Sequence, residues 1–392
     1  MKRSVCLNFR IHQPYQLKAF APSQIDTGDC YFDERANETL INQSADECYL
    51  PANSIILSNI IRTNGLFKVG YSISGTTLEL LLSYRPDVVT SFNNLVKTGS
   101  VEIFAETYYN SPSFLYSTNE FERQIEMHSQ LILEVFGFKP KVFRNTELVY
   151  NNDLARYVYQ LGYLGILCDG VEQILKGRTP NKIYAAPDAG EFALLLRNAR
   201  LSDDIAFRFE NKDWNEYPLT ASRFAGWIHS HPINHPVINL FMDYETFGVH
   251  KTRHSGIFDF LSELPLAILA NKSFRFGTAS EVIEQHYLQD IYDVPSSISW
   301  DNEKAGLDWL EGENQKAALK KIHSLERFIC NSNMEQAIKC WGILQDAHYL
   351  LHETSEAYEH YKNIVVDLEI KLIKEQLKKN KLDFIPFSPN AY

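Results

Sequence analysis

Two carboxylates stand at the ends of apolar segments, which is where an acid–base enzyme needs them. Residues 237–242 (VINLFM) form an apolar run that ends at Asp243, and residues 141–147 (KVFRNTE) begin apolar and end at Glu147. A buried strand that ends in an acid is how barrel enzymes bring a carboxylate to a cleft. The pair therefore suggests acid, base and nucleophile chemistry on a glycosidic bond. The structural explanations of the same pattern are a turn residue at Asp243 and an ion pair between Glu147 and Arg144.

The composition is that of an ordinary globular enzyme with a slight excess of aromatic residues. The chain has 392 residues, of which 45% are hydrophobic, 22% charged and 13% aromatic. This length allows one large domain or two unequal ones. Aromatic rings can stack on sugars, so their excess slightly favours a carbohydrate ligand. The net charge of −11 argues against a nucleic-acid partner, because the phosphates would need a basic face.

The cysteines and the N-terminal segment predict a cytoplasmic protein. The six cysteines (6, 30, 48, 168, 330 and 340) include no C-x-x-C pair, which is typical of free thiols in a reducing compartment. Polar residues interrupt the first twelve positions, so they form no secretory signal. No run of 18 apolar residues is present, and we expect no membrane partner.

The spacing of apolar runs predicts an α/β fold. The expected strands are 4–10, 67–73, 100–105, 141–145, 163–168, 193–197 and 237–243. Helical patterns lie between them at 76–84, 118–136 and 152–161, bounded by a proline, a capping serine and a glycine. Parallel strands joined by helices favour a closed or nearly closed barrel whose loops gather at one face.

The C-terminal part has a different character. Residues 302–382 contain almost no Gly or Pro after Gly312 and are rich in helix-forming residues with a helical period. We therefore expect a catalytic barrel in residues 1–295, followed by an all-helical domain in residues 296–392 that packs on the barrel.

Four short motifs follow one another along the chain: 12–14 (HQP), 99–102 (GSVE), 143–150 (FRNTELVY) and 242–248 (MDYETFG). Together and in this order they resemble the motifs of glycoside hydrolase family 57, specifically of its intracellular α-amylase-like branch. Residues 201–209 and Trp214 also resemble a segment of this branch. The resemblance implies an incomplete (β/α)7 barrel followed by a helical domain, a retaining mechanism and an α-1,4-glucan substrate such as maltodextrin, starch or glycogen.

Two departures from the family pattern are visible. The residue after the fourth motif is Val249, where members of this branch usually have an acid. The fifth motif is matched only approximately by residues 344–349 (LQDAHY), so either Asp346 or His348 could take its substrate-binding place. These departures keep open a catalytically silent glucan-binding protein.

The resemblance assigns the catalytic roles. Glu147 is the expected nucleophile and Asp243 the expected general acid/base. A general acid must hold its proton near neutral pH, which an apolar wall favours, and Phe241, Tyr244 and Phe247 could form that wall. This chemistry needs no cofactor and no metal.

Further residues are expected to bind the substrate. Arg144 could lower the pKa of Glu147 and keep it ionised. His12 could bond a sugar hydroxyl, and Glu102 could orient His12 or hold a hydroxyl itself; a core histidine and a buried structural carboxylate are the alternatives. The candidates for stacking on a sugar ring are Trp214, Trp227, Tyr108 and Trp341. The alternative for each of them is a place in the core.

Two other activities fit the same residues less well. His229 and His231, with His235 nearby, could bind a metal in a carbohydrate deacetylase, but the segment also holds two prolines and no acid early in the chain matches it. A 4-α-glucanotransferase would use the same catalytic pair with a glucan hydroxyl in place of water. The sequence leaves hydrolysis and transfer open.

Overall fold

Seven parallel strands form a closed ring in the computed structural model. Around the ring they are β1 (Arg3–Ile11), β2 (Val69–Ile73), β3 (Val101–Ile103), β4 (Val142–Arg144), β5 (Gly165–Asp169), β7 (Ala193–Arg197) and β8 (Val237–Asp243). A parallel bridge between Ala105 and Phe143 joins the third strand to the fourth. All seven predicted strands are present, and the predicted α/β barrel is confirmed.

The structure describes residues 2–27, 31–300, 307, 310, 312–351 and 356–379. The chain divides into two compact units: residues 1–14 with 35–308, and residues 15–34 with 309–392. The first unit contains the barrel and the second is helical. The domain boundary at 295/296 and the packing of the helical domain on the barrel stay predictions.

Two junctions of the ring rest on a single residue pair: β7 and β8 pair only at Arg197 and Asn239, and the third and fourth strands are joined only by the bridge between Ala105 and Phe143. Three short strands that the sequence did not predict extend the sheet. They are β6 (Ile183–Ala185), antiparallel to β7; β10 (Asp290–Ile291), on β6; and β9 (Phe274–Phe276), on the start of β1. Each of them has only two or three residues, and none lies within a strand that was expected from the sequence.

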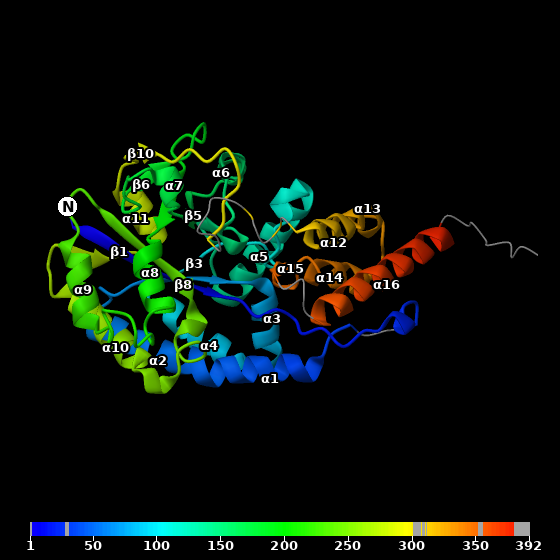
Figure 1. Ribbon diagram of the computed structural model, residues 1–392, viewed down its shortest axis with the longest axis horizontal. Coiled ribbons are helices and arrows are strands. Elements are labelled where there is room, and N and C mark those ends of the chain that lie inside the picture. The colour runs from blue at the N-terminus through cyan, green and yellow to red at the C-terminus, as the bar shows by residue number, and fades with distance from the viewer. Residues whose placement is uncertain are drawn as a thin grey trace, which may run out of the picture. The chain divides into compact units, whose positions relative to one another are not determined.

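Helices cover the outside of the ring (Figure 1). The three predicted helices are α3 (Gly75–Tyr84), α5 (Thr118–Phe136) and α6 (Asn152–Gln160). The others of this unit are α1 (Glu34–Ser44), α2 (Leu50–Arg62), α4 (Pro86–Val96), α7 (Glu172–Leu175), α8 (Ala199–Ala206), α9 (Ala221–Ser230), α10 (Ile257–Leu269) and α11 (Ala279–Gln285). Helix α5 begins where Ser117 accepts a hydrogen bond from the Glu120 amide and ends at Gly137, whose φ of 85° few other residues adopt.

Strand alternation sorts side chains between the helices and the barrel interior. Along β1, Phe9 lies among rings of the outer core, such as Tyr71 and Tyr244, whereas Cys6 belongs to the interior cluster with Phe241. Successive side chains on a strand point to opposite faces, so Asn8 and Arg10 share the interior face with Cys6. Polar residues on an otherwise apolar strand therefore reach the inside of the barrel.

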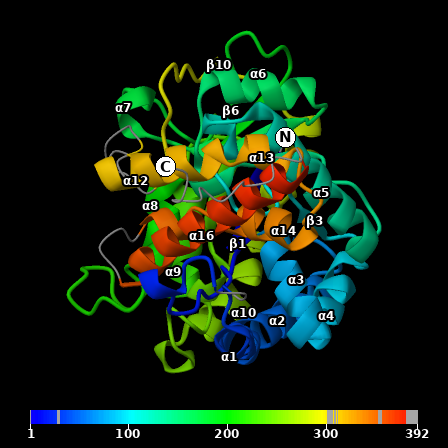
Figure 2. The same cartoon turned by 90° about the vertical axis from the view of Figure 1, so that its right-hand side faces the viewer.

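The second unit is a small helical bundle. Its helices are α12 (Glu313–Ser324), α13 (Glu326–Ile329), α14 (Glu335–Ile343), α15 (His348–Leu351) and α16 (Glu356–Lys379), of which α12, α14 and α16 lie side by side in Figure 2. Trp341 and Tyr361 are completely buried in its core. In the part of the chain that the structure describes, no helix is long and apolar enough to cross a membrane.

The predicted free thiols are present where the structure describes them. Cys6, Cys48 and Cys168 are buried and unbridged, and Cys330 is exposed. Cys30 lies outside the described residues.

Candidate active site

A single guanidinium contacts both predicted catalytic carboxylates. Arg10 Nη2 lies 2.8 Å from Glu147 Oε1, and Arg10 Nη1 lies 3.5 Å from Asp243 Oδ1. The side chain of Glu147 is 4% exposed and that of Asp243 is 34% exposed. The two carboxylates therefore face the same small space, with Asp243 on its open side.

Strand register explains why these charges meet. Arg10 on β1 pairs with Asp243 on β8 and with Ser72 on β2. Residues that pair directly across neighbouring parallel strands project to the same face of the sheet. The three side chains thus lie together inside the barrel, near the C-terminal ends of their strands, where barrel enzymes carry their active sites.

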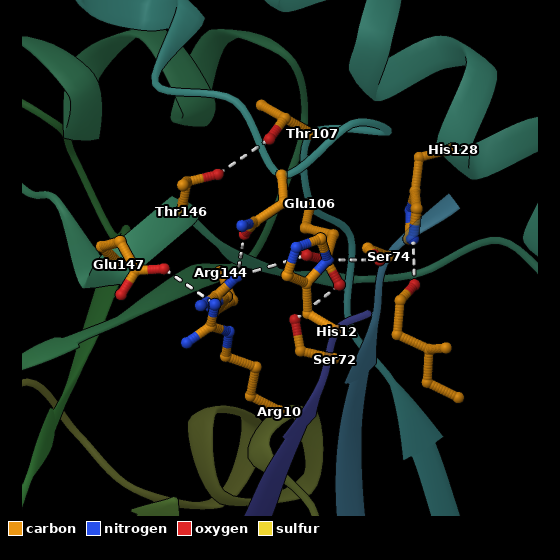
Figure 3. A network of polar contacts seen from close by, with 12 residues as sticks. Arg10, His12, Ser72, Ser74, Glu106, Thr107, His128, Arg144, Thr146 and Glu147 are labelled. Carbon is orange, nitrogen blue, oxygen red and sulfur yellow. Dashed lines mark hydrogen bonds and ion pairs between the residues drawn. The ribbon is translucent and has the colours of Figure 1, made fainter. Parts of the chain in front are cut away.

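Glu147 comes from a turn with an unusual backbone. It lies in a short helical turn (Thr146–Leu148) directly after β4, and Glu147 and Leu148 have φ angles of 50° and 49°. This left-handed conformation is uncommon for residues other than glycine and clusters at functional sites. The Glu147 carbonyl accepts hydrogen bonds from Ser299 Oγ at 2.7 Å and from the Trp300 amide at 3.3 Å. These contacts hold the turn and aim the carboxylate at Arg10 (Figure 3).

The surroundings of Glu147 favour its ionised form. Burial alone would raise the pKa of this carboxyl, but the Arg10 and Arg144 guanidiniums and a hydrogen bond from Trp300 outweigh burial and lower the pKa. Trp300 Nε1 donates to Glu147 Oε2 at 2.8 Å. The same carboxylates act in return on Arg10: burial disfavours its charge, yet Glu147 and Asp243 raise its pKa. A carboxylate that stays ionised is what a nucleophile requires.

Arg144 is held by a partner of its own. It is completely buried, and its Nη1 lies 3.2 Å from Glu106 Oε2. Ser72 donates to the other oxygen of Glu106 at 2.8 Å, so this carboxylate links β2 to β4 (Figure 3). Glu147 therefore forms an ion pair with Arg10, and the charge of Arg144 also lowers the pKa of Glu147.

His12 stands directly after β1 and is oriented by Ser74. Its Nδ1 lies 2.8 Å from Ser74 Oγ, which in turn contacts the hydroxyls of Thr76 and Thr77 at 3.0 and 2.9 Å. The charge of His12 also contributes to the lowered pKa of Glu147. The structure therefore brings His12, Arg144, Glu147 and Asp243 to one place.

Asp243 is followed by a second, buried carboxyl. Glu245 accepts hydrogen bonds from the Tyr49 hydroxyl and from Gln13 Nε2, the latter at 3.0 Å. Burial and the charge of Asp243 raise the pKa of Glu245 to about 7. The aromatic residues expected as a wall, Phe241, Tyr244 and Phe247, are at most 1% exposed and pack into the core. Charged groups that interact with Asp243 include Arg10, Glu245 and Arg144.

Glu102 is engaged at another position in the barrel. It lies on β3, where it pairs with Gly70 of β2. Its Oε2 accepts a hydrogen bond from the Ser280 amide at 3.0 Å. Burial raises the pKa of this carboxyl. Ser74 contacts His12. The two roles expected of Glu102, orienting His12 or holding a sugar hydroxyl, stay predictions.

The predicted aromatic platforms lie in apolar clusters. Trp214 and Trp227 pack against each other at 6.1 Å, and Trp227 packs on Phe224 of α9. Tyr108 is 6% exposed, and its hydroxyl donates to Glu79 at 2.8 Å. Trp341 follows the core alternative: it is completely buried, and its Nε1 donates to the Ile322 carbonyl at 2.7 Å. The substrate contacts of Trp214 and Trp227 stay predictions.

Asp346 and His348 both belong to the second unit. Asp346 is completely buried, and its Oδ1 accepts from the His348 amide at 3.0 Å. This is a local cap at the start of α15. Their substrate roles stay predictions.

The three histidines of the deacetylase alternative do not form one cluster. His229 lies on α9 and contacts the Ile268 carbonyl at 2.9 Å, whereas His231 and His235 approach each other at 3.4 Å beside Asn181. Within the described ranges, no group of three or more His, Cys, Asp or Glu side chains is arranged to hold a metal ion.

Sequence reasoning missed four residues of the site: Arg10, Glu106, Glu245 and Trp300. A signal was available for Arg10, because an arginine in an otherwise apolar strand must project into the barrel. Glu106 and Glu245 lie within or beside the quoted motifs, but nothing local shows their partners. Trp300 lies 153 positions from Glu147, and no pattern in the sequence connects the two.

Comparisons with known proteins agree with this geometry. Residues 6–295 match the sequence profile of Glycosyl hydrolase family 57. A Methanocaldococcus jannaschii protein that is described, provisionally, as an alpha-amylase is 38% identical over 97% of this chain and 86% of its own length.

Solved structures with a similar fold act on carbohydrates. A 4-alpha-glucanotransferase from Thermococcus litoralis has a TM-score of 0.73 at 16% identity over 95% of this chain, which spans about 60% of that enzyme's length. A branching enzyme from Thermococcus kodakaraensis has a TM-score of 0.71 at 14% identity, covering 97% and 92% of the two chains. An alpha-amylase from Thermotoga maritima has a TM-score of 0.67 at 15% identity, covering 97% and 94%.

Proposed function

Because this chain belongs to glycosyl hydrolase family 57, we propose that it is a retaining glycoside hydrolase that cleaves α-1,4-glucans. The relative described as an alpha-amylase supports this substrate. The observation that carries the proposal is the contact of one guanidinium with two carboxylates, one buried and one partly exposed.

The two carboxylates divide the reaction between them. Glu147 attacks the anomeric carbon and forms a glycosyl-enzyme intermediate, while Asp243 donates a proton to the departing glycosidic oxygen. Asp243 then takes a proton from water, which attacks the same carbon and releases Glu147. The lowered pKa of Glu147 supports the first role, and the greater exposure of Asp243 supports proton exchange with solvent and substrate.

The positive groups keep the site organised for this chemistry. Arg10 and Arg144 hold Glu147 ionised in a place where burial would otherwise protonate it. His12, positioned by Ser74, bonds a sugar hydroxyl in this proposal. Glu106 holds Arg144 in place without itself reaching the substrate.

Incubation of the protein with maltoheptaose tests the proposal. The wild type should produce only shorter maltodextrins, whereas a ladder that extends to longer products would show a 4-α-glucanotransferase. Glu147→Gln and Asp243→Asn should each lower turnover by at least about a thousandfold, and the exposed Glu191→Gln serves as the matched control. Full activity in either catalytic variant would refute its role. Tight binding of maltodextrin by the wild type without any product would show a silent glucan-binding protein.

A further inference from the structure

A cavity opens at the same end of the barrel as the catalytic pair. It has a volume of about 490 Å³ and lies at the C-terminal ends of β5 and β7. Its lining includes Asp169, Asn181, Arg197, His235 and Trp300. Asp169 and Arg197 end their strands and pair with each other in register, so they occupy the mouth of the barrel as Arg10 and Asp243 do.

Trp300 links this cavity to the catalytic centre. Its ring lines the cavity, while its Nε1 donates to the nucleophile Glu147. The Arg10 guanidinium lies 5.7 Å from the ring centre, and the Arg197 guanidinium lies 5.5 Å from it. One indole thus forms both the support of the nucleophile and a wall of the neighbouring space.

The lining suits a neutral ligand with many hydroxyl groups. Arg197 forms ion pairs with Asp169 and Asp203, so these charges largely cancel. Asn181 and His235 add donors and acceptors, and Trp300 adds an aromatic face. A strongly charged ligand would meet groups of both signs here, whereas a sugar finds hydrogen-bonding partners and a surface on which to stack.

The carboxylate of Asp169 in the cavity has one oxygen that accepts no hydrogen bond from the described residues. Asp169 is 6% exposed, and its Oδ1 has no hydrogen-bond partner among the described residues; Arg197 Nη1 lies 3.6 Å away. Burial raises the pKa of this carboxyl to about 6, against the opposing charge of Arg197. Leaving a buried acceptor unsatisfied is costly, and a hydroxyl donor would remove that cost.

We infer that this cavity is a glucan-binding subsite that takes one or two glucose units of the chain being processed. This inference rests on the proposed function and adds the residues that hold the glucan beyond the bond being cleaved. A volume of this size lies within the range of small-ligand sites. A sugar bound here would touch the tryptophan that supports Glu147, so occupancy of the cavity and alignment of the nucleophile are coupled.

Filling the cavity tests this inference. Ala199 lines it at the start of α8, and Ala199→Trp places a large ring there without removing any polar group. In the inactive Glu147→Gln protein, calorimetric titration with maltotriose should show a Kd at least tenfold higher when Ala199→Trp is added. Ala270→Trp, at an exposed alanine outside the lining, is the matched control and should leave the Kd within twofold.

A second variant keeps the test valid if Ala199→Trp fails to fold, which circular dichroism would show. His235→Ala removes a side chain at the rim and should weaken maltotriose binding at least threefold. An unchanged Kd in the folded Ala199→Trp protein, or in His235→Ala, would overturn the inference.

Maltoheptaose turnover by the wild type separates the two proposals. Turnover with an unchanged Kd in the cavity variants refutes the subsite alone. A Kd that is sensitive to the cavity in a protein without turnover supports the subsite and refutes the proposed hydrolysis. Absence of both binding and turnover refutes both.

Discussion

Replacing Arg10 should expose how much the site depends on one cation. In Arg10→Met the side chain keeps much of its length and apolar stem but loses the charge that contacts Glu147 and Asp243. Glu147 is 4% exposed and would retain Arg144, the Trp300 N–H and the weaker influence of His12 as favourable partners. The nucleophile would then be a buried carboxylate with much of its compensation removed.

The size of the effect follows from the contact. An opposite charge within about 4–6 Å changes a carboxyl pKa by about 1–3 units, and Arg10 lies 2.8 Å from Glu147. We therefore expect the pKa of Glu147 to rise by at least about 1 unit. Removing one partner of a buried ion pair costs about 3–5 kcal/mol of stability, and Arg144 should keep the loss near the lower end.

The pH dependence gives the sign. In the wild type the lowered pKa of Glu147 contributes stability above its ordinary value of 4.5, and this contribution is lost as the pH falls through the lower folded value. The acid limb of kcat/KM on maltoheptaose should lie below pH 4.5 in the wild type and move upward in Arg10→Met. Urea unfolding at pH 7 and pH 4 should show a smaller gain in stability with rising pH in the variant.

Two further variants serve as controls for the loss of the Arg10 charge. Arg10→Lys restores a positive charge, but an ammonium cannot contact both carboxylates as the fork does, so its acid limb should fall between the other two. Arg223→Met, at a surface arginine, should leave the profile unchanged. An acid limb and a pH-dependent stability in Arg10→Met that match the wild type would refute the assignment of Arg10.

Four other substitutions should have measurable effects. Burial raises the pKa of Glu245 to about 7. The free energy of unfolding should therefore fall by about 3 kcal/mol as the pH rises from 4.5 through 7, because the unfolded chain ionises this group more readily than the native state does. Glu245→Gln should flatten this part of the stability curve in urea titrations. Trp300→Phe keeps a ring but loses the donor to Glu147, so its acid limb should also move upward, by less than in Arg10→Met; no movement would exclude this role. A Cβ on Gly70 would lie 2.3 Å from the Phe104 ring, so Gly70→Ala should lower the free energy of unfolding by about 1–3 kcal/mol. In helix α9 nothing lies within 4 Å of a Cβ on Gly226, so Gly226→Ala should stabilise the protein by about 0.5–1 kcal/mol; thermal unfolding measures both changes.

Local signals account for the parts of the fold that were predicted. Helix α5 begins and ends at its expected residues because a serine cap and a glycine stop lie next to it in sequence. The seven barrel strands are long enough, or flanked by strong enough turn signals, to stand out. The three additional strands have at most three residues each, and their pairing partners lie far away in the chain.

The candidate site was predictable only in its most motif-like members. Glu147 and Asp243 follow apolar strands, and Arg144 lies in the same segment as Glu147, so all three could be named beforehand. The ion pair of Glu147 is made with Arg10, and not with Arg144 as the structural alternative had it, because register places Arg10 beside Asp243 and the turn after β4 points Glu147 toward it. Glu106 satisfies Arg144 instead.

The sequence alone determined the α/β class, the order of the motifs and the position of two carboxylates at the ends of apolar strands, since each of these depends on short stretches of neighbouring residues. Tertiary structure decided which charges meet, which tryptophan donates to Glu147 and where a cavity opens beside them. These depend on strand register and on contacts between residues more than a hundred positions apart, as for Glu147 with Arg10 and with Trp300. Such distances leave no local pattern in a chain, because folding alone brings the residues together.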